Sequence, residues 1–223
     1  RAGVPLLEIV TKPVMSTPIE AAAFARAIRQ TLRFSNVCDG NLEEGSMRCD
    51  CNVSIKPKGQ KELGTKVELK NINSFRFIEK ALEYEIVRQI QCAELGDEIV
   101  QETRLYDSTK NKTFSMRKKE EANDYRYFPE PDLLPLEVTT ERIEEIRLEL
   151  PELPFARMER FMKDMGLGHK EVLLLVSEKE LANYCESLAD VTQDPKLACN
   201  WMTGEFLRLF NESNIEFAAI PIS

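Results

Sequence analysis

Asn41-Leu-Glu-Glu-Gly-Ser-Met-Arg-Cys-Asp-Cys-Asn-Val-Ser54 is followed, after a short turn, by Gly64-Thr-Lys-Val-Glu-Leu-Lys-Asn-Ile-Asn-Ser74. We predict that both stretches contain β-strands, in which successive side chains point to opposite faces of a sheet. One face of each strand would then be polar. On the first strand that face carries Arg48, Asp50, Asn52 and Ser54, and on the second it carries Lys66, Glu68 and Lys70.

These polar faces allow two interpretations, and spacing alone leaves both open. Carboxylates, amides and ammonium groups on one face are the groups that a site for phosphate and a divalent cation needs. The same alternation also fits the solvated outer face of an antiparallel sheet. Cys49 and Cys51 alternate with the polar row, so we expect them to face the core as small apolar residues.

Two turn-like stretches predict hairpins and therefore antiparallel strand pairing. Residues 56–61 carry Pro and Gly between strand-like runs, and the polar residues 107–112 separate two further runs. Between the hairpins, Asn73 or Ser74 can cap a long helix that Gly96 ends. This helix would cover one face of the sheet and leave the polar face open. Its apolar residues at helical spacing are Phe75, Ile78, Leu82, Ile86 and Ile90.

The second part of the chain reads as a series of helices. We predict an α+β domain over residues 1–150, with an antiparallel sheet flanked by helices, followed by an all-α helical domain over residues 151–223. The first 130 residues carry 21 Lys and Arg against 20 Asp and Glu, whereas the rest carry 9 against 18. The acidic second part is a poor candidate for a broad contact with a phosphate backbone.

The composition and the absence of several motifs exclude some classes of protein. No apolar run approaches the roughly 18 residues of a membrane span, so no membrane contact is expected. The six cysteines lack a Cys-x-x-Cys pair and are expected to be free thiols. The sequence carries neither a Walker-type phosphate loop nor a Ser/His/Asp or Cys/His nucleophile pattern. Because the first residue is Arg rather than Met, we expect an internal piece of a longer protein.

Further motifs occur in a fixed order around the two quoted stretches. Arg1-Ala-Gly-Val-Pro-Leu-Leu-Glu-Ile-Val10 precedes them, and Gln101-Glu-Thr-Arg104, Met116-Arg-Lys-Lys-Glu120 and Asp124-Tyr-Arg-Tyr-Phe-Pro-Glu-Pro-Asp-Leu133 follow them. Together these motifs resemble the B subunits of the aspartyl/glutamyl-tRNA amidotransferases. The resemblance covers roughly the whole chain, densely to about residue 135.

The resemblance implies a catalytic domain similar to that of glutamine synthetase, in which a sheet face binds ATP and Mg²⁺. It implies ATP-dependent phosphorylation of Glu on Glu-tRNA(Gln) or of Asp on Asp-tRNA(Asn), followed by amidation with ammonia. A glutaminase partner, the amidase A subunit, would supply the ammonia, and a small C subunit would complete a heterotrimer. The expected location is a bacterial-type cytoplasm or an organellar matrix.

Such a site needs acidic metal ligands, cations for the transferred phosphoryl group and hydrogen-bonding groups. Glu8 and Glu68 match family carboxylates associated with the metal, and the resemblance implies further ligands, a His and a Glu, from an earlier segment. The candidate catalytic residues are Glu8, Asp50, Glu68 and Lys70, and the candidate cofactor-binding residues are Arg48, Asn52, Ser54 and Asn71.

A competing hypothesis is a non-catalytic scaffold or RNA-binding paralogue that keeps the sheet but has lost the reaction. Glu8, Asp50 and Glu68 together count against it, because a scaffold has no need to place like charges near one another.

Overall fold

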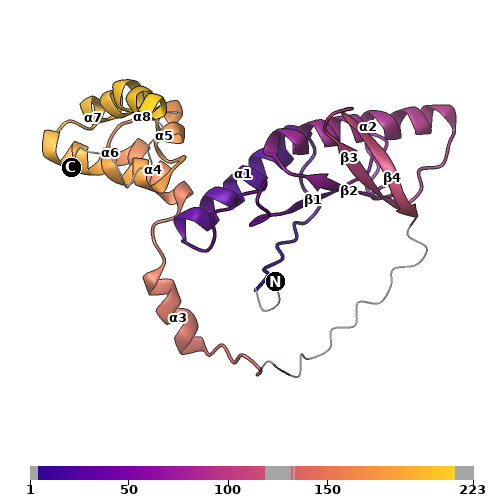
Figure 1. Cartoon of the computed structure of the whole chain (residues 1–223), viewed down its shortest axis with the longest axis horizontal. Coiled ribbons are helices and arrows are strands. Elements are labelled where there is room, and N and C mark those ends of the chain that lie inside the picture. The colour runs from indigo at the N-terminus through magenta and orange to yellow at the C-terminus, as the bar shows by residue number, and fades with distance from the viewer. Residues whose placement is uncertain (1–4, 119–131, 133, 214–223) are drawn as a thin grey trace. The chain divides into compact units, whose positions relative to one another are not determined.

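The computed structural model describes residues 5–118, 132 and 134–213. Packing divides the chain into two compact units (Figure 1). The first consists of residues 1–26 and 41–124, and the second of residues 27–40 and 125–223. The motif at Asp124–Leu133 lies almost entirely outside the described residues, so its role stays a prediction.

The first unit is an α+β arrangement around a four-stranded sheet, with strand order β1-β2-β3-β4. Its four strands are β1 (Cys49–Val53), β2 (Val67–Ile72), β3 (Glu102–Asp107) and β4 (Lys112–Lys118). The two hairpin pairs, β1 with β2 and β3 with β4, are antiparallel as predicted. The prediction of a wholly antiparallel sheet is wrong, because β2 and β3 pair in parallel.

Helix α2 (Phe75–Leu95) explains the parallel pair. Parallel neighbours need a long crossover connection, and the helix between β2 and β3 supplies it. Ser74 caps its start, where the side-chain hydroxyl accepts a hydrogen bond from the Phe77 backbone N–H at 3.2 Å. Gly96 ends it in the left-handed conformation, with φ of 75°. Both ends are therefore where the sequence predicts them.

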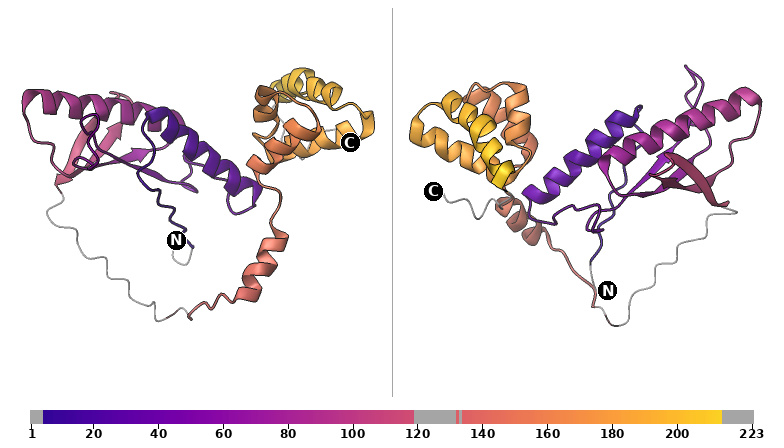
Figure 2. Two further views of the ribbon diagram at one scale, coloured as in Figure 1. Left: turned by 180° about the vertical axis from the view of Figure 1, so that it is seen from behind. Right: turned by 45° about the horizontal axis from the view of Figure 1, so that its top comes forward.

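The core of the first unit lies on one face of the sheet. Helix α2 packs there through Ile78, Ala81 and Leu82, and helix α1 (Pro18–Phe34) contributes Ala22 and Ala25 from its first half (Figure 2). No helix among the described residues of this unit covers the opposite face. The sheet and the adjoining residues contribute Val67, Leu69, Ile72 and Tyr106, with Cys49, Cys51 and Val53 packed beside them.

The predicted apolar stripe of α2 is correct only over its first half. Ile78 and Leu82 are buried, but Ile90 is exposed, and the fully buried positions beyond Leu82 are Glu85 and Gln89. The helix therefore faces polar partners on β3 and β4 rather than an apolar core there.

Strand β2 departs from strict alternation near its end. Asn71 has φ of 65°, in the left-handed region, and the β1–β2 register shifts between Cys49 and Cys51. An extra residue of this kind is a β-bulge, and Asn tolerates the left-handed conformation better than most residues. The bulge allows Ile72 to reach the core although it lies three residues after Leu69.

The second unit is helical. Its core gathers Phe161, Leu175, Leu181 and Met202, and Phe34 at the end of α1 belongs to the same cluster. The end of α1 thus shares a core with the helices after residue 150. The boundary predicted near residue 150 stays a prediction. The helices are α3 (Thr140–Glu149), α4 (Pro154–Asp164), α5 (His169–Leu175), α6 (Lys179–Thr192), α7 (Pro195–Trp201), the π-helix η1 (Met202–Phe206) and α8 (Leu207–Ser213).

One expectation about the cysteines agrees with the structure. All six cysteines are free, as predicted. Over the described ranges, no helix has both the length and the apolar character needed to cross a membrane.

Candidate functional site

A polar cluster lies on the open face of the sheet, on β1, β2 and β3. Alternation places Asp50 outward on β1 between Cys49 and Cys51, which pack toward the core. On β2, Glu68 and Lys70 alternate with the buried Val67 and Leu69. The predicted polar face therefore exists, and it belongs to the side of the sheet that no described helix of the unit covers.

Lys70 joins the two carboxylates of this cluster. Its Nζ lies 3.2 Å from Oδ2 of Asp50 and 3.4 Å from Oε1 of Glu68. The hydrogen bond to Asp50, assisted by the negative charges of Asp50 and Glu68, raises the pKa of Lys70 against the opposing effect of burial. The ammonium group thus stays charged beside two carboxylates.

Thr103 on β3 completes the cluster, although no sequence argument had singled out its side chain. The Thr103 hydroxyl donates a hydrogen bond to Oε2 of Glu68 at 2.7 Å. The two residues are direct register partners in the parallel pair of β2 and β3. Only the unpredicted parallel pairing brings them together, so sequence alternation alone could not have found this contact.

Other predicted site residues lie near the cluster without a bond to its Asp50–Lys70 pair. Asn52 is exposed and sits opposite Glu68 in the β1–β2 register. Arg48 precedes β1 and is exposed, whereas Ser54 follows the strand and is half-buried. Across the described part of the chain, no hydrogen bond or ion pair joins these three side chains to Asp50 or Lys70.

Glu8 and Asn71 lie outside the Asp50–Lys70 pair in the described residues. Glu8 lies in an exposed segment outside the sheet, and within the described residues no hydrogen bond or ion pair connects it with Lys70. Asn71 is also exposed, but its side-chain amide donates a hydrogen bond to the Tyr106 carbonyl oxygen at 3.0 Å. In this structure Asn71 stabilises its bulge. Roles for both residues in binding metal or cofactor stay predictions.

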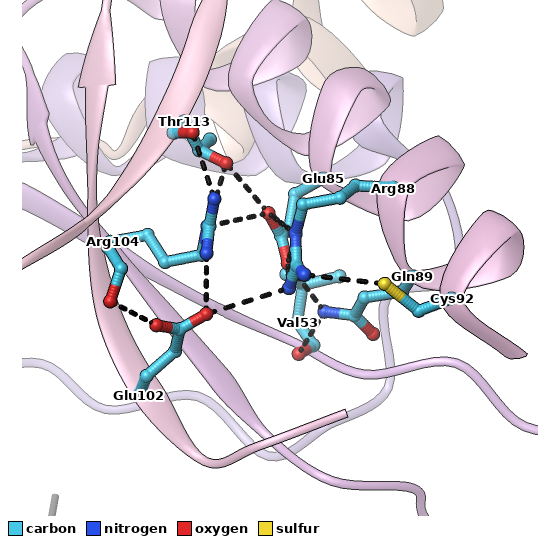
Figure 3. Close-up of polar contacts among 9 residues, drawn as sticks. Val53, Glu85, Arg88, Gln89, Cys92, Glu102, Arg104 and Thr113 are labelled. Atoms are coloured by element: carbon cyan, nitrogen blue, oxygen red, sulfur yellow. Dashed lines mark hydrogen bonds and ion pairs between the residues drawn. The ribbon is translucent and has the colours of Figure 1, made fainter. Parts of the chain in front are cut away.

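A second polar cluster, which sequence reasoning missed, is buried between α2 and the β3–β4 hairpin (Figure 3). Its centre is Glu85, whose carboxylate accepts hydrogen bonds from Arg88 Nε at 2.9 Å, Gln89 Nε2 at 3.0 Å and Thr113 Oγ1 at 2.9 Å. Arg104 Nε lies 3.4 Å from the same carboxylate. We call Glu85, Arg88, Glu102, Arg104 and Thr113 the buried ionic network.

Glu102 is the second acid of the buried ionic network. Its carboxylate accepts a hydrogen bond from Arg104 Nη1 at 2.5 Å and another from the Ser115 hydroxyl. Burial opposes its ionisation, yet the hydrogen bonds from Ser115 and Arg104 hold the pKa of Glu102 below its usual range. Glu85 in turn raises the pKa of Arg88 through their hydrogen bonds. Paired and hydrogen-bonded in this way, the charges can remain buried.

The sequence did contain a signal for this network. Glu85 and Gln89 continue the Ile78–Leu82 stripe at spacings of three and four residues, so they occupy core positions of the helix. A charged residue at such a position requires a partner of opposite charge. That partner, Arg104, lies within the motif Gln101-Glu-Thr-Arg104.

The donor set for a metal ion is incomplete in the described part of the chain. No group of three or more His, Cys, Asp or Glu side chains there could hold a metal ion. Asp50 and Glu68 nevertheless present two carboxylates around one ammonium group. Mg²⁺ is commonly bound by one or two carboxylates together with water and phosphate oxygens. These two residues therefore fit part of a Mg²⁺ site.

Comparison with known proteins gives consistent matches. Residues 1–144 match the family model of the GatB/GatE catalytic domain. The whole chain is 57% identical, over 222 residues, to the B subunit of the aspartyl/glutamyl-tRNA(Asn/Gln) amidotransferase of Bdellovibrio bacteriovorus. The corresponding B subunits of Ectopseudomonas mendocina and Vesicomyosocius okutanii are 52% and 51% identical, again over the whole chain. The chain spans 46%, 46% and 47% of the length of these three relatives.

Proposed function

The chain belongs to the family of GatB/GatE catalytic domains, and on this premise we propose that it forms part of a tRNA-dependent amidotransferase. The proposed reaction is ATP-dependent activation of Glu on Glu-tRNA(Gln), of Asp on Asp-tRNA(Asn), or of both, followed by amidation with ammonia. The observation that carries the proposal is the arrangement of Asp50, Lys70 and Glu68 on the open face of the sheet.

The chemistry explains why such a face is useful. A carboxylate resists attack by ammonia because it is an anion and its oxygen is a poor leaving group. Transfer of a phosphoryl group from ATP to that oxygen releases ADP and gives an acyl phosphate, which removes both obstacles. Ammonia can then attack the acyl carbon, and phosphate leaves. The protein's part in such a transfer is mainly positioning and charge stabilisation.

We assign roles to the residues of the cluster accordingly. Lys70 places a fixed positive charge where phosphate oxygens would lie, and Asp50 holds that ammonium group in position. Glu68, with Asp50 beside it, offers carboxylate oxygens for Mg²⁺ and completes the polar face. When bound there, Mg²⁺ would offset the negative charge of the ATP phosphates. Arg48 and Asn52, next to the cluster in sequence or register, are candidates for contacts with ATP.

The partners in this proposal are a glutaminase, which would release ammonia, and a small third polypeptide. The tRNA carrying the misacylated amino acid would be the substrate. The names of the relatives support a multi-subunit enzyme, since each relative is named as one lettered component of an amidotransferase. A cytoplasmic or organellar-matrix location follows from the same proposal.

The test is a single substitution in the complete heterotrimer. Glu68→Gln keeps the size of the side chain but removes its charge, and we expect amidation of Glu-tRNA(Gln) to fall on the order of a hundredfold or more. Glutamine hydrolysis by the glutaminase partner should remain measurable. The matched control is Glu83→Gln, because Glu83 is an exposed residue of α2.

Two results would count against the proposal. Normal amidation by the Glu68→Gln heterotrimer would remove Glu68 from the mechanism. If calorimetry of the unaltered full-length protein detected no Mg²⁺-dependent binding of ATP, the scaffold or RNA-binding alternative would replace the enzymatic one.

A further inference from the structure

The motif Gln101-Glu-Thr-Arg104 has no part in the chemistry described above, yet three of its side chains make specific contacts. Glu102 and Arg104 join the buried ionic network on the α2 side of the sheet, and Thr103 between them reaches Glu68 on the open side. We propose that Thr103 is a positioning residue for the Glu68 carboxylate and that Glu102 and Arg104 fix the strand that presents it. This inference rests on the proposed role of Glu68.

Thr103 and Lys70 together direct both oxygens of the Glu68 carboxylate. Oε2 accepts the Thr103 hydrogen bond at 2.7 Å, and Oε1 lies 3.4 Å from Lys70 Nζ. Thr103 is only 1% exposed, so water has little access with which to replace its hydroxyl. A carboxylate held at both oxygens has one orientation. In phosphoryl transfer such preorganisation matters, because small displacements of a positioning group cost large factors in rate.

Contacts on the α2 side of the sheet fix the backbone at Thr103. Arg104 donates from Nε to Thr113 Oγ1 and from Nη2 to the Thr113 carbonyl oxygen, both at 2.9 Å. Its Nη1 pairs with Glu102 at 2.5 Å. The β3–β4 register shifts between Thr103 and Arg104, and a bulge of this kind re-aims a neighbouring side chain. The buried ionic network thus stabilises the β-bulge that lies beside Thr103.

The proposal assigns the effect to the hydroxyl group rather than to the volume of the side chain. Thr103→Val has the same shape without the hydroxyl, whereas Thr103→Ser keeps the hydroxyl without the methyl group. Both are to be measured in the complete heterotrimer. Thr109→Val is the matched control, because Thr109 lies exposed in the turn between β3 and β4.

We expect Thr103→Val to lower kcat for amidation by about tenfold to a hundredfold, the effect of losing one hydrogen bond to a charged group. KM for the tRNA and glutamine hydrolysis should stay as in the unaltered enzyme, and Thr103→Ser should restore most of kcat. A crystal structure of the Thr103→Val heterotrimer should show the Glu68 carboxylate turned away from residue 103. If Thr103→Val does not assemble, Thr103→Ala removes the same hydroxyl without an added methyl group.

A double substitution separates this inference from the proposed function. Glu68→Gln combined with Thr103→Val should be no slower than Glu68→Gln alone, since Thr103 acts through Glu68. A Thr103→Val enzyme within twofold of the unaltered one, or a Thr103→Ser enzyme as slow as Thr103→Val, would overturn the positioning role. If Glu68→Gln is inactive in that case, the proposed role of Glu68 still stands. Full activity of Glu68→Gln would overturn both the role of Glu68 and the positioning role of Thr103.

Discussion

Substituting Glu85 tests the energetic importance of the buried ionic network. Glu85→Gln keeps the side chain's shape and one carbonyl oxygen but removes the negative charge that faces two guanidinium groups. The Glu85 side chain is fully buried, and the side chains of Arg88 and Arg104 are 21% and 12% exposed. The change therefore leaves two largely buried cations with one carboxylate fewer.

The expected loss can be estimated from these contacts. Removing one partner of a buried ion pair costs about 3–5 kcal/mol. Arg104 retains Glu102 at 2.5 Å, and Arg88 retains some contact with water. We therefore expect the lower end, about 3 kcal/mol of unfolding free energy.

The assay is thermal and urea unfolding of the full-length protein, with hydrogen exchange of the α2 and β4 amides to assign the loss to this unit. Glu83→Gln on the exposed side of α2 is the control, and it should change stability by less than about 0.5 kcal/mol. If Glu85→Gln costs less than about 1 kcal/mol, or no more than the control, the network does not stabilise the fold as argued.

Two further predictions concern the same unit. Because the pKa of Glu102 is lowered in the folded state, its ionisation stabilises the protein above the unfolded pKa of about 4.3, and this contribution disappears as the pH falls through the folded pKa. Urea unfolding between pH 6 and 3 should therefore show a steeper loss of stability for the unaltered protein than for Glu102→Gln, and equal slopes would contradict the pairing. Asn71→Gly should lower the free energy of unfolding by only about 1 kcal/mol, because it loses the bond to Tyr106. Asn71→Val should lower it by about 1–2 kcal/mol more, because the branched side chain disfavours the positive φ. Equal urea midpoints for the Gly and Val variants would show that the bulge is not required.

Much of the fold could be predicted from local sequence patterns. Alternation correctly assigned Asp50, Glu68 and Lys70 to the polar face and Cys49 and Cys51 to the core, and Ser74 and Gly96 set the ends of α2. The parallel pairing of β2 with β3 could not be derived in this way, because it depends on how a 21-residue helix returns the chain to the sheet. The matches with known proteins confirm the family that the ordered motifs indicated.

Only part of the candidate site could be predicted, again because local sequence patterns do not reveal long-range strand pairing. Asp50 and Lys70 belong to adjacent antiparallel strands, so a local pattern could bring them together. The contacts of Thr103 and Arg104 depend on tertiary pairing, and the sequence spacing of neither residue indicates its partner. Asn71 forms a backbone contact at a bulge, a structural role that its sequence position does not indicate, and its part in cofactor binding stays a prediction.

The parallel junction between β2 and β3 also affects the order in which the protein can fold. Each hairpin closes a shorter loop than the α2 crossover does and can form earlier, whereas the junction must wait for the whole crossover to close. Glu68 and Thr103, which are 35 residues apart, meet on that junction. A chain with both hairpins formed but α2 undocked would carry the Asp50–Lys70 pair without an oriented Glu68. Newly made molecules should therefore acquire the complete polar face only after α2 has docked on the sheet.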